Sequence, residues 1–446
     1  MNCIHWRRST TSATKLRHGT PGSLLGISVV FLTIIALLGL TGCGSSSKSS
    51  SSSVLPTPSA AAKVNGYLGT QGAQNQNTTG IYAGGLWQMT LDDKSDTYNI
   101  ALSMELNQTG LGSTTGSNGV LVLAGVDNGN NGYAVEIPGR AALYRPGGPP
   151  EAIVTAPVVM IQQGDCLQLN GTAAFQFVPL PDARWNPATD WAYGSLQAST
   201  SGTQWSFSNL SLFTLSGSVV KAPAMQTGTC GDTKNGNVIS ILPDTTNNIP
   251  ATTVGVGPTG YFFADASFSF STEVLALPGK IGVIQPASAL DTSAVTAASY
   301  KGLLFRAVPM NSPDYGTASN PMTQLVAFGP GTIGALAGGS YPSSQSNLGG
   351  VVFDLTQSPA SNIGITLGTE DAKNNGLYKA ASVTLPDSGN LCSTTTGTAG
   401  KDATGNPTCT VPAVAVVGNP EGKYAIFLIA EDLLTSRPLG IYLYQQ

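Results

Sequence analysis

Short apolar segments recur along the chain, each bounded by glycine, proline, asparagine or aspartate. β-Branched and aromatic residues dominate them, and this composition fits a pleated strand. The predicted strands are 85–91, 98–106, 120–126, 133–137, 173–178, 193–198, 204–215, 238–242, 260–264, 281–285, 303–308, 324–328, 351–355, 363–367, 378–385, 411–417, 424–430 and 439–444. The pattern predicts an all-β fold of many short antiparallel strands.

Helical periodicity is scarce by comparison. The one segment that predicts a helix is 286–300 (PASALDTSAVTAASY), which is short and weakly amphipathic. The clearest hairpin is 120–137, because the turn signal Asp127-Asn128-Gly129-Asn130-Asn131-Gly132 separates two apolar strands.

Faint internal repetition accompanies these strands. A similar turn segment ending in Asn-Asn-Gly occurs at 371–376, again followed by a tyrosine-bearing strand. Tyr-x-Gly opens apolar segments at Tyr67, Tyr82 and Tyr300. Such repetition indicates a propeller-like or a barrel/sandwich architecture. We expect one or two β domains in a body spanning 63–446, with a subdivision near 215–250.

The first residues predict export. Residues 1–42 combine four basic residues with the apolar run Leu24–Leu40, and the first acid of the chain is Asp92. Leu40-Thr41-Gly42-Cys43 resembles the lipobox of bacterial lipoproteins, and this resemblance implies a signal peptide removed before a lipidated Cys43. Residues 43–62 are rich in serine with two prolines, the composition of a tether.

Loss of the leader changes the charge and the available chemistry. It removes four of the 20 Lys and Arg, so 16 remain against 24 acids, a formal charge of −8. This acidic balance argues against a nucleic-acid partner. Both histidines, His5 and His18, lie in the leader, so the body has no Ser-His-Asp, Cys-His or HExxH site.

Four cysteines remain in the body, and an exported protein is expected to oxidise them. They are Cys166, Cys230, Cys392 and Cys409, which allow three pairings. We favour Cys392–Cys409, which closes a Gly/Thr-rich loop, together with Cys166–Cys230. No spacing resembles CxxC, so no thiolate metal site is predicted.

Three further motifs have plainer explanations than a site. G-x-G-x-x-G occurs at 255–260 and 329–334, and the glycine content of the chain explains about one such match by chance. The second is followed by Gly338-Gly339 and Pro342, which leave no helix to hold a pyrophosphate, so no cofactor is predicted. Asp127 and Asp371 are weak calcium candidates, since turn chemistry alone explains both segments. Ser218-x-x-Lys221 lacks the companion motifs of a Ser-Lys enzyme.

Carboxylates are the remaining catalytic candidates, because a glycosidase needs only two. The candidates are Glu105, Asp127, Glu136, Asp265, Glu273, Asp354, Glu370, Asp371, Glu431 and Asp432. Trp185, Trp191, Tyr193 and Trp205 would either line a sugar platform or fill the core, and the core is the commoner place for them.

The leader with LTGC, the segment 257–260 opening an aromatic strand, and the C-terminal stretch 418–444 resemble a group of uncharacterised bacterial surface lipoproteins. That group has no assigned activity. We therefore expect a lipid-anchored envelope protein at the outer membrane or cell surface, more ligand- or partner-binding or structural than enzymatic. Its partners would be the membrane, through the lipid, and a glycan or protein ligand. The alternative is a carboxylate-dependent glycan-active enzyme.

Overall fold

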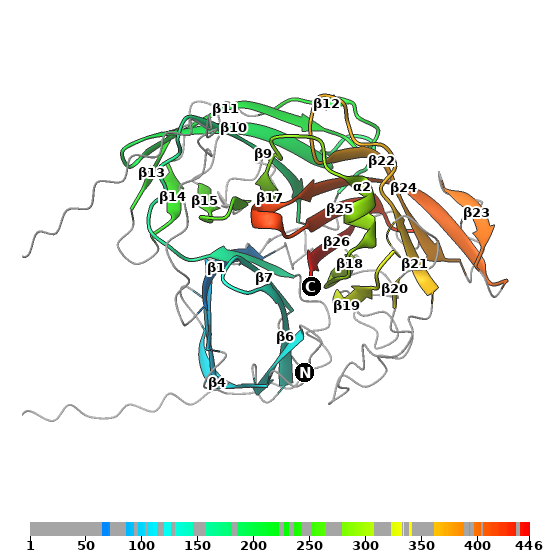
Figure 1. Cartoon of the computed structure of the whole chain (residues 1–446), viewed down its shortest axis with the longest axis horizontal. Coiled ribbons are helices and arrows are strands. Elements are labelled where there is room, and N and C mark those ends of the chain that lie inside the picture. The colour runs from blue at the N-terminus through cyan, green and yellow to red at the C-terminus, as the bar shows by residue number, and fades with distance from the viewer. Residues whose placement is uncertain are drawn as a thin grey trace, which may run out of the picture. The chain divides into compact units, whose positions relative to one another are not determined.

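The protein is described here by a computed structural model (Figure 1). It describes residues 65–71, 86–92, 97–102, 106–113, 120–125, 130–145, 157–180, 185–222, 227–231, 236–242, 252–264, 279–306, 323–331, 333, 339–340, 361–387, 392, 397–402, 405–433 and 438–446. Every described residue belongs to one compact unit, Ser52–Gln446. The leader, Cys43 and the tether therefore lie outside the described residues.

The first part of the body is a closed barrel in which each strand pairs with the next and the last pairs with the first. Its strands are β1 (Asn65–Gln71), β2 (Trp87–Asp92), β3 (Thr97–Leu102), β4 (Leu106–Ser113), β5 (Val120–Gly125), β6 (Asn130–Ile137), β7 (Ala141–Arg145) and β8 (Val158–Gln162). The hairpin predicted at 120–137 is confirmed, since Val120 pairs with Val135 and Leu123 with Gly132.

The second part repeats this plan. Its strands are β9 (Thr172–Pro179), β10 (Tyr193–Ser201), β11 (Gln204–Phe213), β12 (Val219–Val220), β13 (Thr227–Cys230), β14 (Val238–Ile241), β15 (Thr252–Val256), β16 (Tyr261–Ala264) and β17 (Lys280–Ile284). Leaving out the two-residue β12, eight strands pair in chain order, and β17 returns to pair with β9. The hydrogen-bonded neighbours therefore follow one another in a ring, as in the first barrel.

The third part follows the same order. Its strands are β18 (Tyr300–Arg306), β19 (Thr323–Phe328), β20 (Gly339–Ser340), β21 (Ser361–Thr366), β22 (Leu377–Pro386), β23 (Thr398–Lys401), β24 (Pro407–Gly418), β25 (Ala425–Glu431) and β26 (Pro438–Gln445). β23 is an added edge strand, β22 pairs directly with β24, and β26 pairs with β18. The body is thus three successive eight-stranded meanders, which we call rings 1, 2 and 3.

A glycine stands where the first and last strands of each ring meet. A Cβ on Gly69 of β1 would lie 2.0 Å from the Val159 carbonyl oxygen, and one on Gly302 of β18 would lie 1.8 Å from that of Tyr442. In ring 2 the glycine is on the last strand, where a Cβ on Gly282 would lie 2.3 Å from the Gln176 oxygen. Only a residue without a Cβ permits so close an approach of two backbones.

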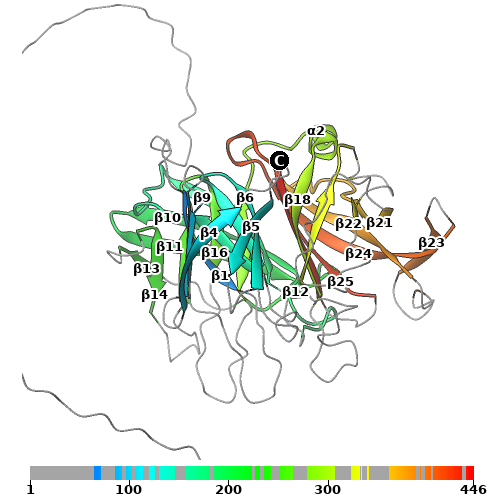
Figure 2. The ribbon, with the colours of Figure 1, turned by 90° about the horizontal axis from the view of Figure 1, so that it is seen from below.

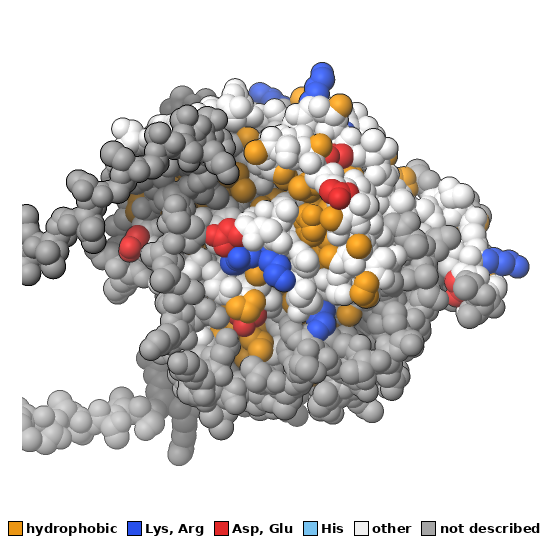
Figure 3. Space-filling model, in the orientation of Figure 1, with side chains coloured by type: hydrophobic (Ala, Val, Ile, Leu, Met, Phe, Trp, Pro, Cys, Tyr) orange, Lys and Arg blue, Asp and Glu red, His pale blue; other side chains and the backbone are white. Residues whose placement is uncertain are grey.

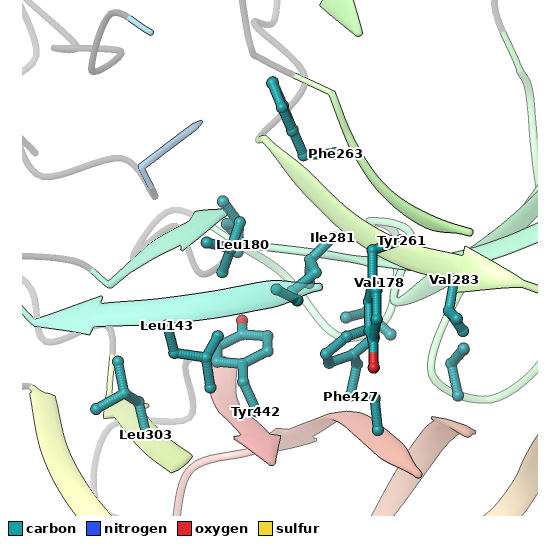
Figure 4. Packing of buried hydrophobic residues seen from close by; sticks show 14 of the residues in the cluster. Leu143, Val178, Leu180, Tyr261, Phe263, Ile281, Val283, Leu303, Phe427 and Tyr442 are labelled. Atoms are coloured by element: carbon teal, nitrogen blue, oxygen red, sulfur yellow. The ribbon is translucent and has the colours of Figure 1, made fainter. Parts of the chain in front are cut away.

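Alternate side chains of the strands enter two kinds of core. One set fills the interior of each ring, and the other set fills a central core to which all three rings contribute (Figure 4). In β16, for example, Tyr261 and Phe263 face the central core while Phe262 and Ala264 face the ring 2 interior. Strands beside the central core are therefore buried on both faces, and outer strands such as β11 alternate between buried and exposed residues.

Each ring has two ends, defined by its connections. The turn end carries the connections after the second, fourth and sixth strands, together with the start of the first strand and the end of the last. The far end carries the connections after the odd strands. Contacts across the turn end include Gln168 Nε2 donating to the Gly202 oxygen and Gln446 N donating to the Ser299 oxygen. Figure 2 shows α2 and the C-terminus at this end.

The all-β prediction is confirmed, and among its alternatives the structure has barrel-like rings and no propeller blades in the described chain. The helix predicted at 286–300 is shorter: α2 spans Thr292–Ala297, with Asp291 as its N-cap accepting from Ser293 N at 3.0 Å. The segment 215–250, where a subdivision was expected, lies inside ring 2. The rings instead meet at 163–171 and 285–299.

Candidate functional site

Three equivalent turns come together at the turn end. Each connects the sixth strand of a ring to its seventh, and each contains a proline followed by a glycine with positive φ. The turns are 138–140, 257–260 and 419–422, and we call their meeting point the three-turn junction. The glycines are Gly139 (φ 69°), Gly260 (φ 90°) and Gly422 (φ 79°). Proline fixes its own φ and glycine adopts the left-handed conformation, so these sequences favour tight turns.

Contacts between rings hold the junction together. Arg140 Nη2 of the first turn lies 2.9 Å from Glu421 Oε2 of the third, and their side chains are 23% and 35% exposed. Gln162 N donates to the Arg140 oxygen at 2.8 Å. Gly257 of the second turn packs beside Ile161, since a Cβ there would lie 3.4 Å from that side chain. The Arg140–Glu421 ion pair thus links rings 1 and 3 beside the turn of ring 2.

Glu421 has an unusual backbone. Its φ of 51° and ψ of 35° lie in the left-handed region, which among the described non-glycine residues only Asn209 also enters. An L-residue that is not glycine typically costs about 1–2 kcal/mol in this conformation. The strain places the Glu421 carboxylate against Arg140, so an energetically unfavourable backbone is retained where the three rings meet.

Five buried polar atoms of the three turns and of strands β16 and β26 have no hydrogen-bond partner in the protein. They are Arg140 Nη1, Thr259 Oγ1, the Tyr261 hydroxyl, Asn419 Oδ1 and the Tyr444 hydroxyl. Thr259, Tyr261 and Tyr444 are 3%, 1% and 0% exposed. Each buried unpaired group typically costs about 1–3 kcal/mol, so five such groups call for an explanation.

Tyr261 lies close to Tyr444, and its hydroxyl feels the charges of Arg140 and Glu421. The rings of Tyr261 and Tyr444 meet edge-on with centroids 5.8 Å apart, and Figure 4 shows the Tyr261 hydroxyl directed towards the strand that carries Phe427. A Cβ on Gly418, which precedes Asn419, would touch Val283, and Val283 pairs with Tyr261. The void beside the two tyrosine rings is apolar and has no room for a water molecule, so it supplies no partner for the hydroxyls.

Burial keeps the two tyrosines neutral. It raises the pKa of Tyr261 far above its usual value, with the Arg140 charge acting in the opposite direction and Glu421 in the same one. Burial likewise raises the pKa of Tyr444, helped by Tyr261. Both hydroxyls therefore keep a proton to donate at any physiological pH.

A second polar contact joins the first turn to the interior of ring 1. The Tyr67 hydroxyl donates to Glu136 Oε2 at 2.5 Å and accepts from Gly139 N at 3.0 Å. Tyr67 belongs to the interior cluster of ring 1, and Glu136 shares a strand face with Ala134 of that cluster. The Glu136 carboxylate and Arg140 thus flank the same turn, one on the ring interior and one on the junction.

Both predicted disulfides are confirmed. Cys166 and Cys230 have Cα atoms 5.9 Å apart, and Cys392 and Cys409 have Cα atoms 5.4 Å apart. The first ties two connections at the turn end of ring 2. The second fixes the base of the β23–β24 arm at the far end of ring 3.

Asp371, one of the two weak calcium candidates, has partners within the fold. Its carboxylate lies 2.6 Å from Lys379 Nζ and accepts from Lys373 N, Asn374 N and Asn374 Nδ2 at 2.9–3.0 Å. Asp127 lies outside the described residues. Within the described ranges, no group of three or more Cys, Asp or Glu could hold a metal ion.

The candidate catalytic acids that the structure describes lie on three separate segments of the chain. Glu136 pairs with Tyr67 as above, and Glu370 binds the backbone N–H groups of Leu290 and Gly376, which fixes the connection before β22. Glu431 and Asp432 end β25, and Asp432 is fully buried. The candidates that lie outside the described residues are Glu105, Asp127, Asp265, Glu273 and Asp354.

The aromatic and glycine motifs are structural. Trp185, Trp191, Tyr193 and Trp205 are all buried, so they form no surface platform for a sugar. The segment 255–260 is the β15–β16 hairpin, in which Gly260 N donates to the Gly257 oxygen at 2.9 Å. In 329–334, Gly331 N donates to the Thr296 oxygen at 2.9 Å. Ser218 N donates to Thr214 Oγ1 in the turn before β12, away from a helix.

The described side chains on one face of the molecule include acidic and basic residues. Figure 3 shows this face with scattered acidic and basic side chains, and some of opposite sign lie together near its middle. No helix in the described part of the chain has the length and apolar character needed to cross a membrane.

Sequence reasoning missed the junction residues. It named the segments 257–260 and 418–444 but did not connect them with Pro138-Gly139-Arg140. The signal that could have found them is the recurrence of a proline–glycine turn before a buried strand, at Pro138, Pro258 and Pro420.

Comparisons with known proteins add little. No family model matches the chain, and no curated protein matches it. Among solved structures, it is similar to a protein of unknown function from the DUF3598 family of Nostoc punctiforme, with 8% identity, 50% of this chain and 93% of that chain covered, and a TM-score of 0.18. A likeness this weak supports no conclusion about fold or function.

Proposed function

We propose that this chain is a lipid-anchored protein of the cell envelope that binds a small polar ligand at the three-turn junction without catalysing its conversion. The observation that carries the proposal is the group of five unpaired buried polar atoms of the three turns and of strands β16 and β26, together with the Arg140–Glu421 ion pair. A ligand that supplies their partners would recover much of their desolvation cost.

The leader sequence supports the proposed lipid anchor, and the two disulfides are consistent with export. The LTGC segment ending at Cys43 follows a basic and apolar leader, and a serine-rich tether follows it. The two disulfides of the body fit an oxidising compartment. The destination we propose is the outer membrane or the cell surface, because Gly44 gives no aspartate-type retention signal.

Binding is favoured over turnover. The sequence has no histidine after His18, and the described acids Glu136, Glu370 and Asp371 bind neighbouring donors of the fold. No observation on the described residues favours the glycan-active enzyme. A strained residue such as Glu421 at a polar junction is typical of functional sites.

The test of binding is a thermal-shift panel on the full-length protein in a detergent without a sugar headgroup. Glucose, sodium phosphate and tetramethylammonium chloride represent neutral, anionic and cationic solutes. We expect one class to raise the Tm saturably, and Arg140→Met to abolish the shift. Lys401→Met, on exposed β23, is the control for the lost charge. Equal responses of Arg140→Met and wild type to all three classes would refute binding at the junction.

The anchor has its own test. Cells given labelled palmitate should incorporate it into the wild-type protein, and Cys43→Ala should lose the label. Unchanged labelling of the Cys43→Ala protein would refute the proposed lipidation.

A further inference from the structure

The unpaired atoms of the junction define the chemistry of the ligand, and this inference rests on the proposed function. Arg140 Nη1 can only donate a hydrogen bond, and Asn419 Oδ1 can only accept one. The hydroxyls of Thr259, Tyr261 and Tyr444 can do either. A ligand that satisfies the set must therefore both donate and accept.

Charged ligands fit this requirement less well than neutral ones. A carboxylate has no proton to give Asn419 Oδ1, and an ammonium ion has no lone pair for Arg140 Nη1. Phosphate keeps a P–OH proton near neutral pH and can donate, but it brings a net charge. The Arg140–Glu421 pair is neutral overall. A net charge added beside this partly buried pair would be desolvated without a counter-charge of its own.

Alcohol groups meet the whole requirement, since each hydroxyl donates one hydrogen bond and accepts others. We infer that the three-turn junction binds a neutral molecule carrying several hydroxyl groups, such as a polyol or a saccharide unit, with Arg140 donating to one hydroxyl and Asn419 accepting from another.

Exposure decides the direction from which this ligand arrives. Arg140 and Glu421 reach solvent, while Thr259, Tyr261 and Tyr444 lie beneath them. The void beneath the tyrosine rings has no room for a ligand. Binding therefore begins at the ion pair and requires the three turns to move apart slightly, so that hydroxyls reach the buried atoms.

The test compares a sugar with its methylated form by isothermal titration calorimetry. Methyl α-glucopyranoside keeps its hydroxyl protons, whereas the permethylated sugar accepts hydrogen bonds but cannot donate them. We expect the first to bind the full-length protein and the second to bind at least tenfold more weakly. Tyr261→Phe, which removes only a hydroxyl, should weaken binding of the first by about tenfold, and Lys401→Met should not change it.

The outcomes separate the two proposals. Binding of phosphate but not of methyl glucoside, lost in Arg140→Met, would overturn the hydroxyl ligand and leave a binding junction. Equal affinity for the two sugars, or no effect of Tyr261→Phe, would also overturn it. If no probe binds, the proposed function fails together with this inference.

Discussion

The closing glycine of ring 3 gives a quantitative test of the fold. In Gly302→Ala, the added Cβ would lie 1.8 Å from the Tyr442 carbonyl oxygen, whereas a carbon–oxygen contact needs about 3.3 Å. The strands β18 and β26 would have to separate by about 1.5 Å at this point. In this ladder Gly302 pairs with Leu443, and Leu303 pairs with Tyr442. Leu443 and Tyr442 are both buried.

The expected loss of stability follows from the hydrogen bonds that this separation breaks. If two buried backbone groups lose their partners at about 2 kcal/mol each, Gly302→Ala lowers the free energy of unfolding by about 4 kcal/mol. Gly400→Ala is the matched control, because Gly400 lies on the exposed edge strand β23 with Thr408 Oγ1 at 3.2 Å as the nearest atom. It should change stability by less than about 1 kcal/mol.

The assay is urea unfolding of the oxidised protein, followed by circular dichroism. Gly69→Ala should show a penalty like that of Gly302→Ala, since its Cβ would meet the Val159 oxygen of the first barrel at 2.0 Å. A Gly302→Ala protein as stable as Gly400→Ala would show that the first and last strands of ring 3 do not approach as described, and the argument for three equivalent rings would fail.

Three other changes test separate parts of the structure. Without ligand, Tyr261→Phe should raise the free energy of unfolding by about 1 kcal/mol, because it removes a buried hydroxyl that has no partner; a destabilised variant in urea unfolding would show that the hydroxyl is paired. Replacing both Cys392 and Cys409 by alanine should lower it by about 3 kcal/mol, the loop-closure entropy for their separation of 17 residues; a loss below 1 kcal/mol would contradict this. Burial raises the pKa of Asp371, but hydrogen bonds from Lys379 and the following loop outweigh it and hold the pKa below the usual value. Its stabilising contribution is therefore present above the unfolded pKa of about 3.9 and is lost as pH falls through the lower folded value, so Asp371→Asn should flatten the fall of Tm between about pH 4 and pH 2.

The sequence predicts the strands best where their composition is typical. β25 (AIFLIAE) and β16 (YFFA) are rich in apolar and aromatic residues and were predicted within one or two positions. β4 (LNQTGLGS) and β13 (TGTC) were missed, because glycine and polar residues weaken the strand signal. In β15 (TTVGV), pairing with its neighbours outweighs a weak local preference.

The three rings and the junction depend on long-range contacts that no local pattern records. The Tyr-x-Gly motif was a true repeat at Tyr67 and Tyr300, which occupy the first strands of rings 1 and 3. The two Asn-Asn-Gly segments do not occupy equivalent positions, because one follows the fifth strand of ring 1 and the other follows the fourth strand of ring 3. Arg140 and Glu421 are 281 positions apart, so only closure and packing of the rings bring them together.

The first and last described strands of the body place both of their outer ends on one side of the rings. β1 starts and β26 ends at the turn end. The described chain therefore begins and ends at the same end of the molecule as the three-turn junction. A tag or fluorophore fused after Gln446 would start at the end that carries the proposed ligand site and not at the far end.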